Sequence, residues 1–374
     1  AFTYTEPYEG FSENEYCAVL VGKFDGEVKP NKDEIDKIRY VKWEEVKQEL
    51  KANPAMFTKW FRDSIPILEK FINEYPNFIS FCWHGGEPML RGLNFFKKIC
   101  KIQEKYKSKS QIIENRLQTN ATLINQEWAD FFKEFDFKIG VSIDGPEQLN
   151  DNQRFFKNGH GSYGEIARGI NVLRKNKIPF SVLITVTGET VEYPDKIYDF
   201  VVRERFLTVK FNPCFGNHKL SVNFIDYAYF MNKIFDLWFE EDRVELSIGP
   251  VEDIMKSVLG GYPHICHMRN TCYRHVKIDY NGDVVPCDVF LGKDFKFGNI
   301  LNQEITDIIK SKQYLVFFNA VKEIPKWCLN CKWYYVCGSG CSRHSFEGNL
   351  IKKQNKMCES KKIMFEHIAQ VIKK

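Results

Sequence analysis

Two patterns of apolar residues alternate through the middle of the chain. Short continuous apolar runs predict buried strands, while apolar residues three and four positions apart predict amphipathic helices. Runs of the first kind lie at residues 79–83, 115–119, 138–143, 179–187 and 209–211. Stretches of the second kind lie between them, at residues 93–102, 128–135, 162–175 and 193–206. The sequence therefore predicts strands and helices in regular alternation.

This alternation favours parallel strands joined by right-handed helical crossovers, in a barrel or a doubly wound sheet. With residues 2–5 as a first strand the count is six, fewer than the eight of a closed barrel. We expect an α/β fold, a partial (β/α)6 barrel of the TIM type. Ser162 is predicted to cap the helix over 162–175, with Glu165 completing a capping box.

The alternation ends after residue 211. A long helix is expected over 224–241, a strand over 244–248 and a short helix over 251–259, followed by a segment rich in cysteine. We place a domain boundary near residue 250, with a barrel over 1–250 and a second domain with a C-terminal helix over 251–374. Residues 22–55 are charged and predict a surface insertion before a helix over 57–75.

Charge and composition narrow the possible partners. The formal net charge of +4 is too small to indicate nucleic acid or an acidic membrane surface. Apolar stretches such as 179–186 are much shorter than the roughly 20 residues of a spanning helix. The beginning of the chain lacks the basic and apolar regions of a secretory signal, so a cytoplasmic location is expected.

Eight of the twelve cysteines crowd into the last third of the chain, in numbers that suit two sites of four ligands. A chain of 374 residues can build a core without disulfides, so metal or cluster ligation is favoured. On spacing alone, structural zinc and iron–sulfur clusters are both possible. Nearby cations are expected to lower the pKa values of the thiols and favour metallation; they are Arg274, Lys277, Lys332 and Arg343.

The spacing Cys272-x9-Gly282-x4-Cys287, followed by Cys-x2-Cys-x5-Cys-x3-Cys from residue 328 and by Cys358, resembles the SPASM domain of radical S-adenosylmethionine (SAM) maturases. The additional Cys266 resembles the anaerobic sulfatase-maturing enzymes. This resemblance favours iron–sulfur clusters over structural zinc and implies two auxiliary 4Fe-4S clusters. The first would be held by Cys266, Cys272, Cys287 and Cys341, and the second by Cys328, Cys331, Cys337 and Cys358. It also makes Asp288 the counterpart of the carboxylate that takes a proton from the substrate; the alternative is a solvated turn residue.

Motifs of the predicted barrel occur in the order found in the same family. They are Trp83-His84-Gly85-Gly86-Glu87-Pro88, residues 117–122 (LQTNAT), residues 141–146 (VSIDGP) and Arg154 before Gly159-His160-Gly161. The resemblance implies that Gly85, Gly86 and Glu87 hold the amino end of SAM, with Ser142 and Arg154 on its carboxylate and ribose side. A turn cap for Ser142 and a local ion pair for Arg154 are the structural alternatives. His84 stands where sulfatase-maturing relatives carry glutamine.

One family feature is incomplete. The family's Cys-x3-Cys-x2-Cys loop after the first strand supplies three thiolates to the cluster that reduces SAM, whereas here Gly10, Asn14 and Cys17 occupy those positions. Glycine has no ligand atom and an amide oxygen is a poor ligand for iron in a sulfide cluster. The chain is a degenerate member, ligates iron unusually, or has a loop that differs from that of the natural protein.

Two functions follow as expectations. The first is a SAM-binding iron–sulfur protein that oxidises a peptide or protein side chain, for example to formylglycine or to a crosslink, with an electron donor such as a flavodoxin or ferredoxin. The second is a catalytically degenerate member that serves as a peptide-binding or partner protein. A zinc-ribbon binding protein is a third, less favoured interpretation.

Overall fold

A computed structural model gives the fold. It describes residues 2–8, 11–17, 48, 51–52, 78–107, 111–216, 219–269, 271–272, 275–279, 281–290, 295–347, 350–351 and 354–373. The chain divides into two compact units, Ala1–Phe81 with Lys97–Glu114, and Cys82–Phe96 with Asn115–Lys374. The predicted helix over 57–75 and most of the predicted insertion over 22–55 lie outside the described residues.

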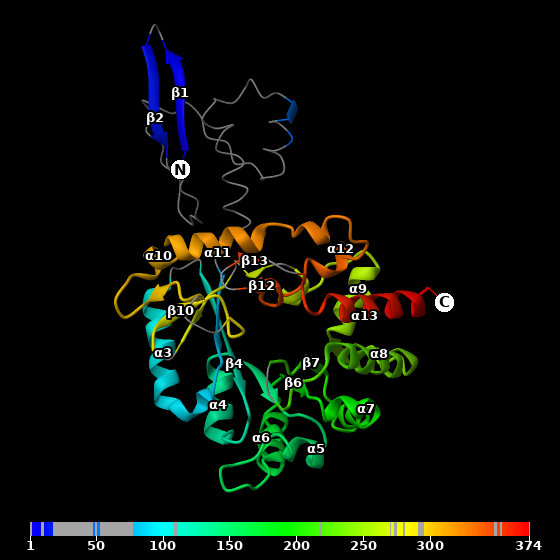
Figure 1. The fold of residues 1–374 in the computed structure, drawn as a ribbon. Helices are drawn as coiled ribbons and strands as arrows, with labels where there is room; N and C mark the ends of the chain where they lie inside the picture. The colour runs from blue at the N-terminus through cyan, green and yellow to red at the C-terminus, as the bar shows by residue number, and fades with distance from the viewer. Residues whose placement is uncertain are drawn as a thin grey trace. The chain divides into compact units, whose positions relative to one another are not determined.

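The central element is a six-stranded sheet with the order β3-β4-β5-β6-β7-β8 (Figure 1). The strands are β3 Phe78–Trp83, β4 Ile112–Thr119, β5 Lys138–Ser142, β6 Phe180–Val186, β7 Thr208–Pro213 and β8 Ser247–Gly249. Every neighbouring pair from β4 to β8 is parallel. Helices alternate with these strands: α3 Leu93–Tyr106, α4 Gln126–Glu134, α5 Glu147–Asp151, α6 Tyr163–Lys175, α7 Pro194–Arg203, α8 Phe224–Glu240 and α9 Val251–Val258. The expected partial barrel of parallel strands is confirmed.

The identity of two strands differs from the prediction. The strand expected over 2–5 is β1 (Phe2–Tyr8), which pairs antiparallel with β2 (Phe11–Cys17) and is not part of the six-stranded sheet. The sixth strand of the sheet is instead β8. An antiparallel pair needs only a tight turn, whereas a parallel pair needs a crossover of a dozen or more residues, so β1 can pair with its neighbour in sequence.

The predicted capping box of α6 is wrong. Ser162 precedes the helix, but its backbone is not extended (φ −103°, ψ −4°) and its side chain makes no cap hydrogen bond. Its hydroxyl donates to the carbonyl oxygen of Arg154 at 2.8 Å. Glu165 forms an ion pair with Arg168 at 2.6 Å. Both side chains therefore bond to groups other than the backbone N–H groups that a capping box would satisfy.

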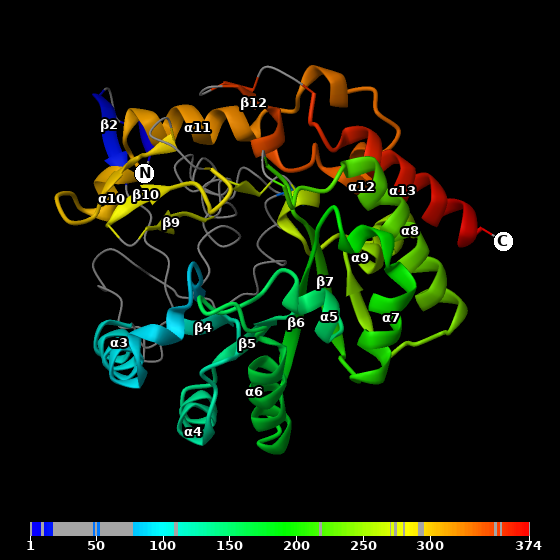
Figure 2. The same ribbon diagram turned by 60° about the horizontal axis from the view of Figure 1, so that its bottom comes forward.

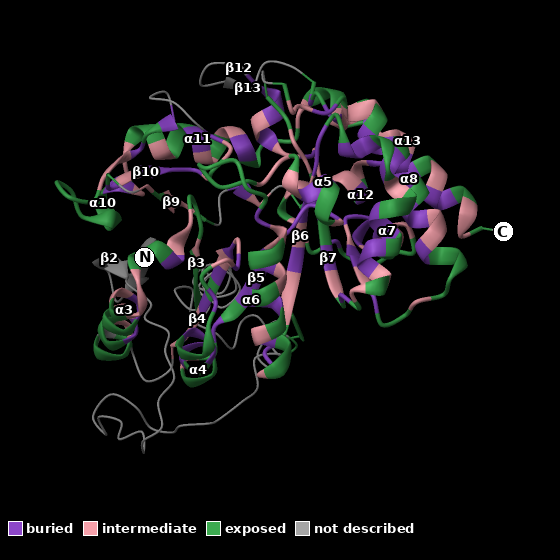
Figure 3. Ribbon diagram, turned by 90° about the horizontal axis from the view of Figure 1, so that it is seen from below, coloured by how far each residue is buried: buried purple, intermediate pink, exposed green. Residues whose placement is uncertain are grey.

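Aromatic rings fill the space between the sheet and its first helices. Phe96 of α3 is fully buried and contacts five rings, those of Trp83, Phe95, Trp128, Phe131 and Phe137. The burial colouring of Figure 3 shows β6 and β7 as largely buried or intermediate, with exposed residues on the outer side of α4 and α6. This core fixes the strands whose ends carry the polar motifs.

The cysteine-rich part has short elements. It contains the three-stranded sheet β11-β10-β9 and the hairpin β12-β13, with β9 Lys277–Ile278, β10 Asp283–Val285, β11 Gly298–Asn299, β12 Phe346–Glu347 and β13 Leu350–Ile351. Its helices are α10 Ile305–Ile308, α11 Lys312–Lys322, α12 Tyr334–Cys337 and α13 Cys358–Val371. Figures 1 and 2 show α13 beside α8, and a 2.6 Å contact joins His367 to Asp236 across these helices. The domain boundary near residue 250 stays a prediction.

None of the described helices combines the length and the apolar composition that crossing a lipid bilayer requires.

Candidate functional site: a polar strand-end cluster and two thiol groups

Glu87 is held where β3 and β4 end. Gly85 and Gly86 have φ values of +101° and +57°, a region that favours glycine, and they turn the chain after β3. The Glu87 carboxylate accepts hydrogen bonds from the Thr119 hydroxyl at 2.8 Å and the Asn120 backbone N–H at 2.8 Å. It also accepts from the Met89 backbone N–H at 3.1 Å. These three donors fix a half-buried anion at the carboxyl end of the sheet.

Ser142 lies at the end of β5 and accepts a hydrogen bond from the Gln118 side-chain amide at 2.9 Å. Gly140 makes room for this contact, because a Cβ atom there would lie 2.2 Å from Gln118 Oε1. Ser142 and Glu87 therefore occupy the ends of nearby strands in the same sheet. His84 is exposed directly after β3.

Arg154 forms an ion pair with Asp144 at 2.6 Å and a second hydrogen bond to it at 3.2 Å. The Asp144 side chain is only 3% exposed and also accepts from the Thr185 backbone N–H at 2.8 Å. The structure thus gives Arg154 the local acid named as its structural alternative. Its predicted role toward SAM stays a prediction.

The eight late cysteines lie in two groups. In the first group, desolvation raises the pKa of Cys266, raises that of Cys287 to about 12 and raises that of Cys341 to about 11. Charge on Cys272 raises the pKa of all three further, so Cys272 is close to each of them. Cys266 is the exposed member and Cys272 the buried one. These four are the set that the resemblance implies for the first cluster.

The second group is formed by the other four. Burial raises the pKa of Cys328, and charge on Cys337, Cys358 and Cys331 raises it further. Burial likewise raises the pKa of Cys337, with added effects from Cys358 and Cys331. The side-chain amide of Gln354 contacts Cys358 Sγ at 3.0 Å. The loop after α11, helix α12 and the start of α13 thus converge on one place.

The donor set suits iron–sulfur chemistry. All eight thiols are free of disulfides, and sulfur is the ligand that clusters use. Among the described residues, no group of three His, Cys, Asp or Glu side chains is close enough to hold one metal ion. In a cluster, the thiolates bind different irons around a cage rather than a single ion. The residue types of the two sets therefore suit such cages, and their assignment to two clusters stays a prediction.

The expected net lowering of the thiol pKa values by nearby cations is not found. The pKa values of five of these thiols are raised, because desolvation outweighs the attraction of the positive groups. Lys332 pairs with Glu366 at 3.0 Å and Lys277 with Asp279 at 3.1 Å, while Arg343 donates to the Val289 carbonyl. Arg274 lies outside the described residues.

One cation that does lie beside the thiols is Lys361, to which the sequence motifs did not point. It lowers the pKa of Cys266, Cys337 and Cys341, although burial dominates at each of them. Its position three residues after Cys358 was the available signal, because residues three apart share one face of a helix.

Asp288 is exposed and follows Cys287 directly. Its charge contributes to the raised pKa of Cys82, which is otherwise due to desolvation, and contributes in the same way at Cys266. It opposes the effect of burial on His275, whose pKa is lowered. The carboxylate therefore lies near both β3 and the first thiol group.

The N-terminal loop has a different form from the one expected. Gly10 lies outside the described residues, whereas Asn14 and Cys17 belong to strand β2, in which Cys17 pairs with Phe2. The donor set of glycine, asparagine and one cysteine does not fit a cluster that needs three thiolates.

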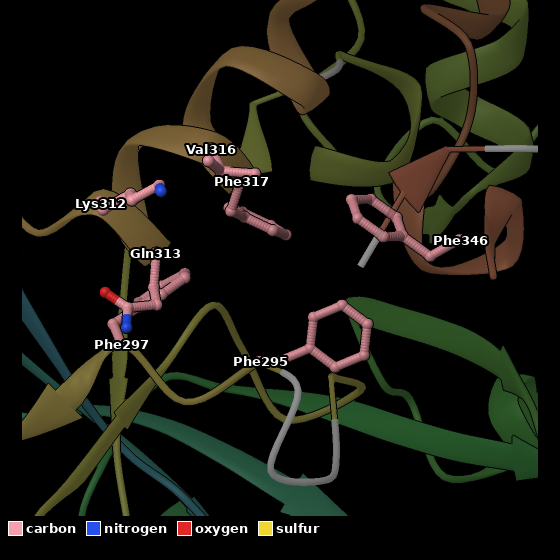
Figure 4. A pocket seen from close by; sticks show the side chains of 7 residues that line it. All are labelled: Phe295, Phe297, Lys312, Gln313, Val316, Phe317 and Phe346. Carbon is pink, nitrogen blue, oxygen red and sulfur yellow. The ribbon is translucent and has the colours of Figure 1, made fainter. Parts of the chain in front are cut away.

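A cavity of about 350 Å³ lies elsewhere in the cysteine-rich part, as Figure 4 shows. Its lining is mostly aromatic and aliphatic: Phe295, Phe297, Val316, Phe317 and Phe346, with Lys312 and Gln313. It contains neither the thiols nor the strand-end polar groups, so it is separate from the candidate site.

Two known protein families match this chain, one over the barrel and one over the cysteine-rich part. Residues 16–201 match the radical SAM superfamily and residues 266–332 match the SPASM iron–sulfur cluster-binding domain. The first match includes Cys17 but not Gly10 or Asn14.

Individual relatives agree with the family matches. The cysteine-type anaerobic sulfatase-maturating enzyme of Clostridium novyi (strain NT) is 33% identical, over 80% of this chain and 83% of its own. The serine-type enzyme of Bacteroides thetaiotaomicron is 30% identical, over 81% of this chain and 80% of its own.

The fold gives the same answer. The structure of native anSMEcpe with bound AdoMet has a TM-score of 0.72 at 28% identity, covering 82% of this chain and 88% of that one. A structure of the same protein with AdoMet and the Kp18Cys peptide has a TM-score of 0.72 and covers 89% of that chain. Sequence and fold thus show that this chain belongs to the anaerobic sulfatase-maturating enzyme family, within the radical SAM superfamily and with a SPASM domain.

Proposed function

We propose that this protein binds SAM and two auxiliary 4Fe-4S clusters and oxidises a cysteine or serine side chain of a peptide or protein. The observation that carries the proposal is the convergence of eight disulfide-free thiols into two groups of four in the same unit as the Glu87 cluster. The peptide substrate is carried over from the sulfatase-maturating relatives and from the peptide in the related structure. Formylglycine or a crosslink is the expected kind of product.

On this proposal Glu87 holds the ammonium group of SAM. Its carboxylate is already oriented by three donors, so it can receive a cation without reorganising. Gly85 and Gly86 let the backbone approach the ligand closely, and Ser142 and Arg154 face its carboxylate and ribose side. SAM supplies a carbon-centred radical when it is reduced, and the residues at positions 10 and 14 do not fit the cluster that would reduce it.

Asp288 is the proposed acceptor of the substrate proton. It is an exposed carboxylate close to Cys82 on the barrel and to Cys266 of the first thiol group. Asp288→Asn keeps the shape but removes the basic oxygen. We expect this variant to keep its iron and its SAM affinity and to lose peptide oxidation; oxidation at the wild-type rate would exclude the role.

Iron counting and SAM cleavage test the proposal on the full chain. After anaerobic reconstitution, about twelve irons per chain would mean three 4Fe-4S clusters and about eight would mean two. Incubation with SAM, a strong reductant and a cysteine-containing peptide should yield 5′-deoxyadenosine and an oxidised peptide. A flavodoxin or ferredoxin is the expected physiological electron donor.

A second candidate function rests on the incomplete loop at Gly10, Asn14 and Cys17. It is a degenerate member that binds a peptide or a partner and retains its two clusters as structural supports. About eight irons, tight peptide binding and no 5′-deoxyadenosine would establish it. The boundary near residue 250 separates barrel from cluster domain under either function.

A further inference from the structure

Lys361 is a buried lysine on α13. It is 3% exposed, and its ammonium group donates a hydrogen bond to the carbonyl oxygen of His267 at 2.8 Å. Within the part of the chain that the structure describes, no carboxylate forms an ion pair with it. A buried charge without a counter-charge is costly, typically by several kcal/mol. Something else must compensate it.

The groups around Lys361 belong to both thiol sites. Its charge acts on Cys266 and Cys341 of the first group and on Cys337 of the second. Gly340, with φ of +77°, lies directly against it, because a Cβ atom there would be 3.3 Å from Nζ. Gly340 immediately precedes Cys341, so the backbone that carries a thiol passes the ammonium group at close range.

The neighbouring histidines cannot supply the counter-charge. An imidazole ring is either neutral or cationic, so neither His267 nor His344 can balance an ammonium group. Asp288 also acts on Cys266, but it is exposed and forms no ion pair with Lys361 among the described residues, so the cysteines are the groups that can place negative charge beside the buried ammonium group. A 4Fe-4S cluster with four thiolates is a delocalised anion, and reduction by one electron adds a further negative charge.

We propose that Lys361 is the shared counter-charge of the two auxiliary clusters and raises the reduction potential of both. The inference rests on the proposed pair of clusters and adds a positioning residue that nothing in the cysteine motif specifies. A cation near a cluster stabilises the more negative, reduced form, and a low-dielectric surrounding strengthens this effect. One buried lysine between the thiol groups would thus make both clusters better electron acceptors.

Anaerobic redox titration followed by electron paramagnetic resonance tests the inference. Lys361→Met keeps the length of the side chain and removes its charge, so both auxiliary midpoint potentials should move to more negative values. Lys361→Arg should retain most of the wild-type potential. The matched control is Lys332→Met. This lysine follows Cys331, but its side chain is 71% exposed and paired with Glu366. Solvent screens its charge, so removing it should leave both midpoint potentials nearly unchanged. Equal potentials in wild type and Lys361→Met, with iron retained, would overturn the inference.

Iron-free protein supplies a second readout in case Lys361→Met loads its clusters poorly. A counter-charge has no partner when iron is absent, so the iron-free variant should melt at the same temperature as iron-free wild type or above it. A lower melting temperature would show a merely structural lysine and would overturn the inference. Wild type that takes up no iron would sink the proposed function as well, whereas loaded wild type with unshifted variant potentials sinks this inference alone.

Discussion

The two halves of the candidate site are stabilised in opposite ways. At the strand ends, the charged groups already have partners: Glu87 accepts three hydrogen bonds, and Asp144 is paired with Arg154. In the cysteine-rich part the thiols have no disulfide partners, burial raises the pKa values of five of them, and the supporting strands are two or three residues long. The first region is built before a ligand arrives, whereas the second needs one to be stable.

This difference indicates where ligand binding contributes to folding. A site made of satisfied hydrogen bonds gains little stability from SAM beyond simple mass action. A site made of buried protonated thiols must release those protons as iron binds, so metallation and folding are coupled. The barrel should therefore keep its stability without cofactors, whereas the cysteine-rich part should be less stable without them.

The largest expected effect is that of iron removal. Anaerobic chelation should loosen residues 266–358 while the sheet stays folded, with a loss of stabilisation on the order of 10 kcal/mol, as for structural metals. Limited proteolysis with mass spectrometry would locate the first cuts. Cys337→Ser should lose about four irons per chain and Cys82→Ser none. First cuts in the barrel would instead show that the barrel is the part that depends on iron.

Breaking the ion pair of the barrel is next in size. Arg154→Met leaves the buried Asp144 carboxylate without its cation and should lower the free energy of unfolding by about 3–5 kcal/mol. Urea denaturation measures this directly. The control is Arg174→Met, since the Arg174–Glu204 pair is partly exposed on both sides and should contribute at most about 1 kcal/mol. Equal losses of unfolding free energy in the two variants would mean that burial of Asp144 adds nothing to the strength of its ion pair.

Glu87→Gln sharpens the claim that the carboxylate is a preformed ammonium site. The amide oxygen can still accept from the Thr119 hydroxyl and the Met89 N–H, whereas the amide NH2 then faces the Asn120 N–H. The fold should persist with some loss of stability, but SAM loses a charged partner. A charged hydrogen bond is worth about 1.5–3 kcal/mol, which predicts roughly 10- to 100-fold weaker SAM binding by calorimetry. Glu165→Gln, at an exposed pair with Arg168, should bind SAM like the wild type. Unchanged affinity in Glu87→Gln would remove the residue from the SAM site.

The smallest effect concerns the barrel alone. Burial raises the pKa of Tyr227 above its ordinary value near 10, while its hydroxyl donates to the Phe211 carbonyl at 2.8 Å. The folded state keeps the proton that the unfolded state loses above pH 10, so this tyrosine's contribution to stability is complete below pH 10 and falls as pH rises further. The slope is about 1.4 kcal/mol per pH unit. Tyr227→Phe should unfold with a shallower dependence on pH between 10 and 12; identical slopes would contradict this.

Much of the fold and site was predictable because the signals are local. Apolar runs gave the central strands β3 to β7, and fixed motifs placed Glu87, Ser142 and Arg154 near strand ends. A strand was expected over 244–248, close to β8 (Ser247–Gly249), but its exchange with β1 as the sixth strand of the sheet was not predictable, because the pattern of so short a run does not specify its pairing partner. Its pairing with β7 is decided by the surrounding sheet.

The sequence by itself determined the chemistry available to this protein: eight late thiols, a glycine-flanked glutamate, and a loop with one cysteine where three are expected. Only the tertiary structure decided which groups share an environment. It paired Arg154 with Asp144, turned Ser162 from a cap into a partner of Arg154, and set Lys361 beside both thiol groups. Residue type and spacing are local properties, whereas burial and charge neighbours depend on segments far apart in the chain that fold against each other.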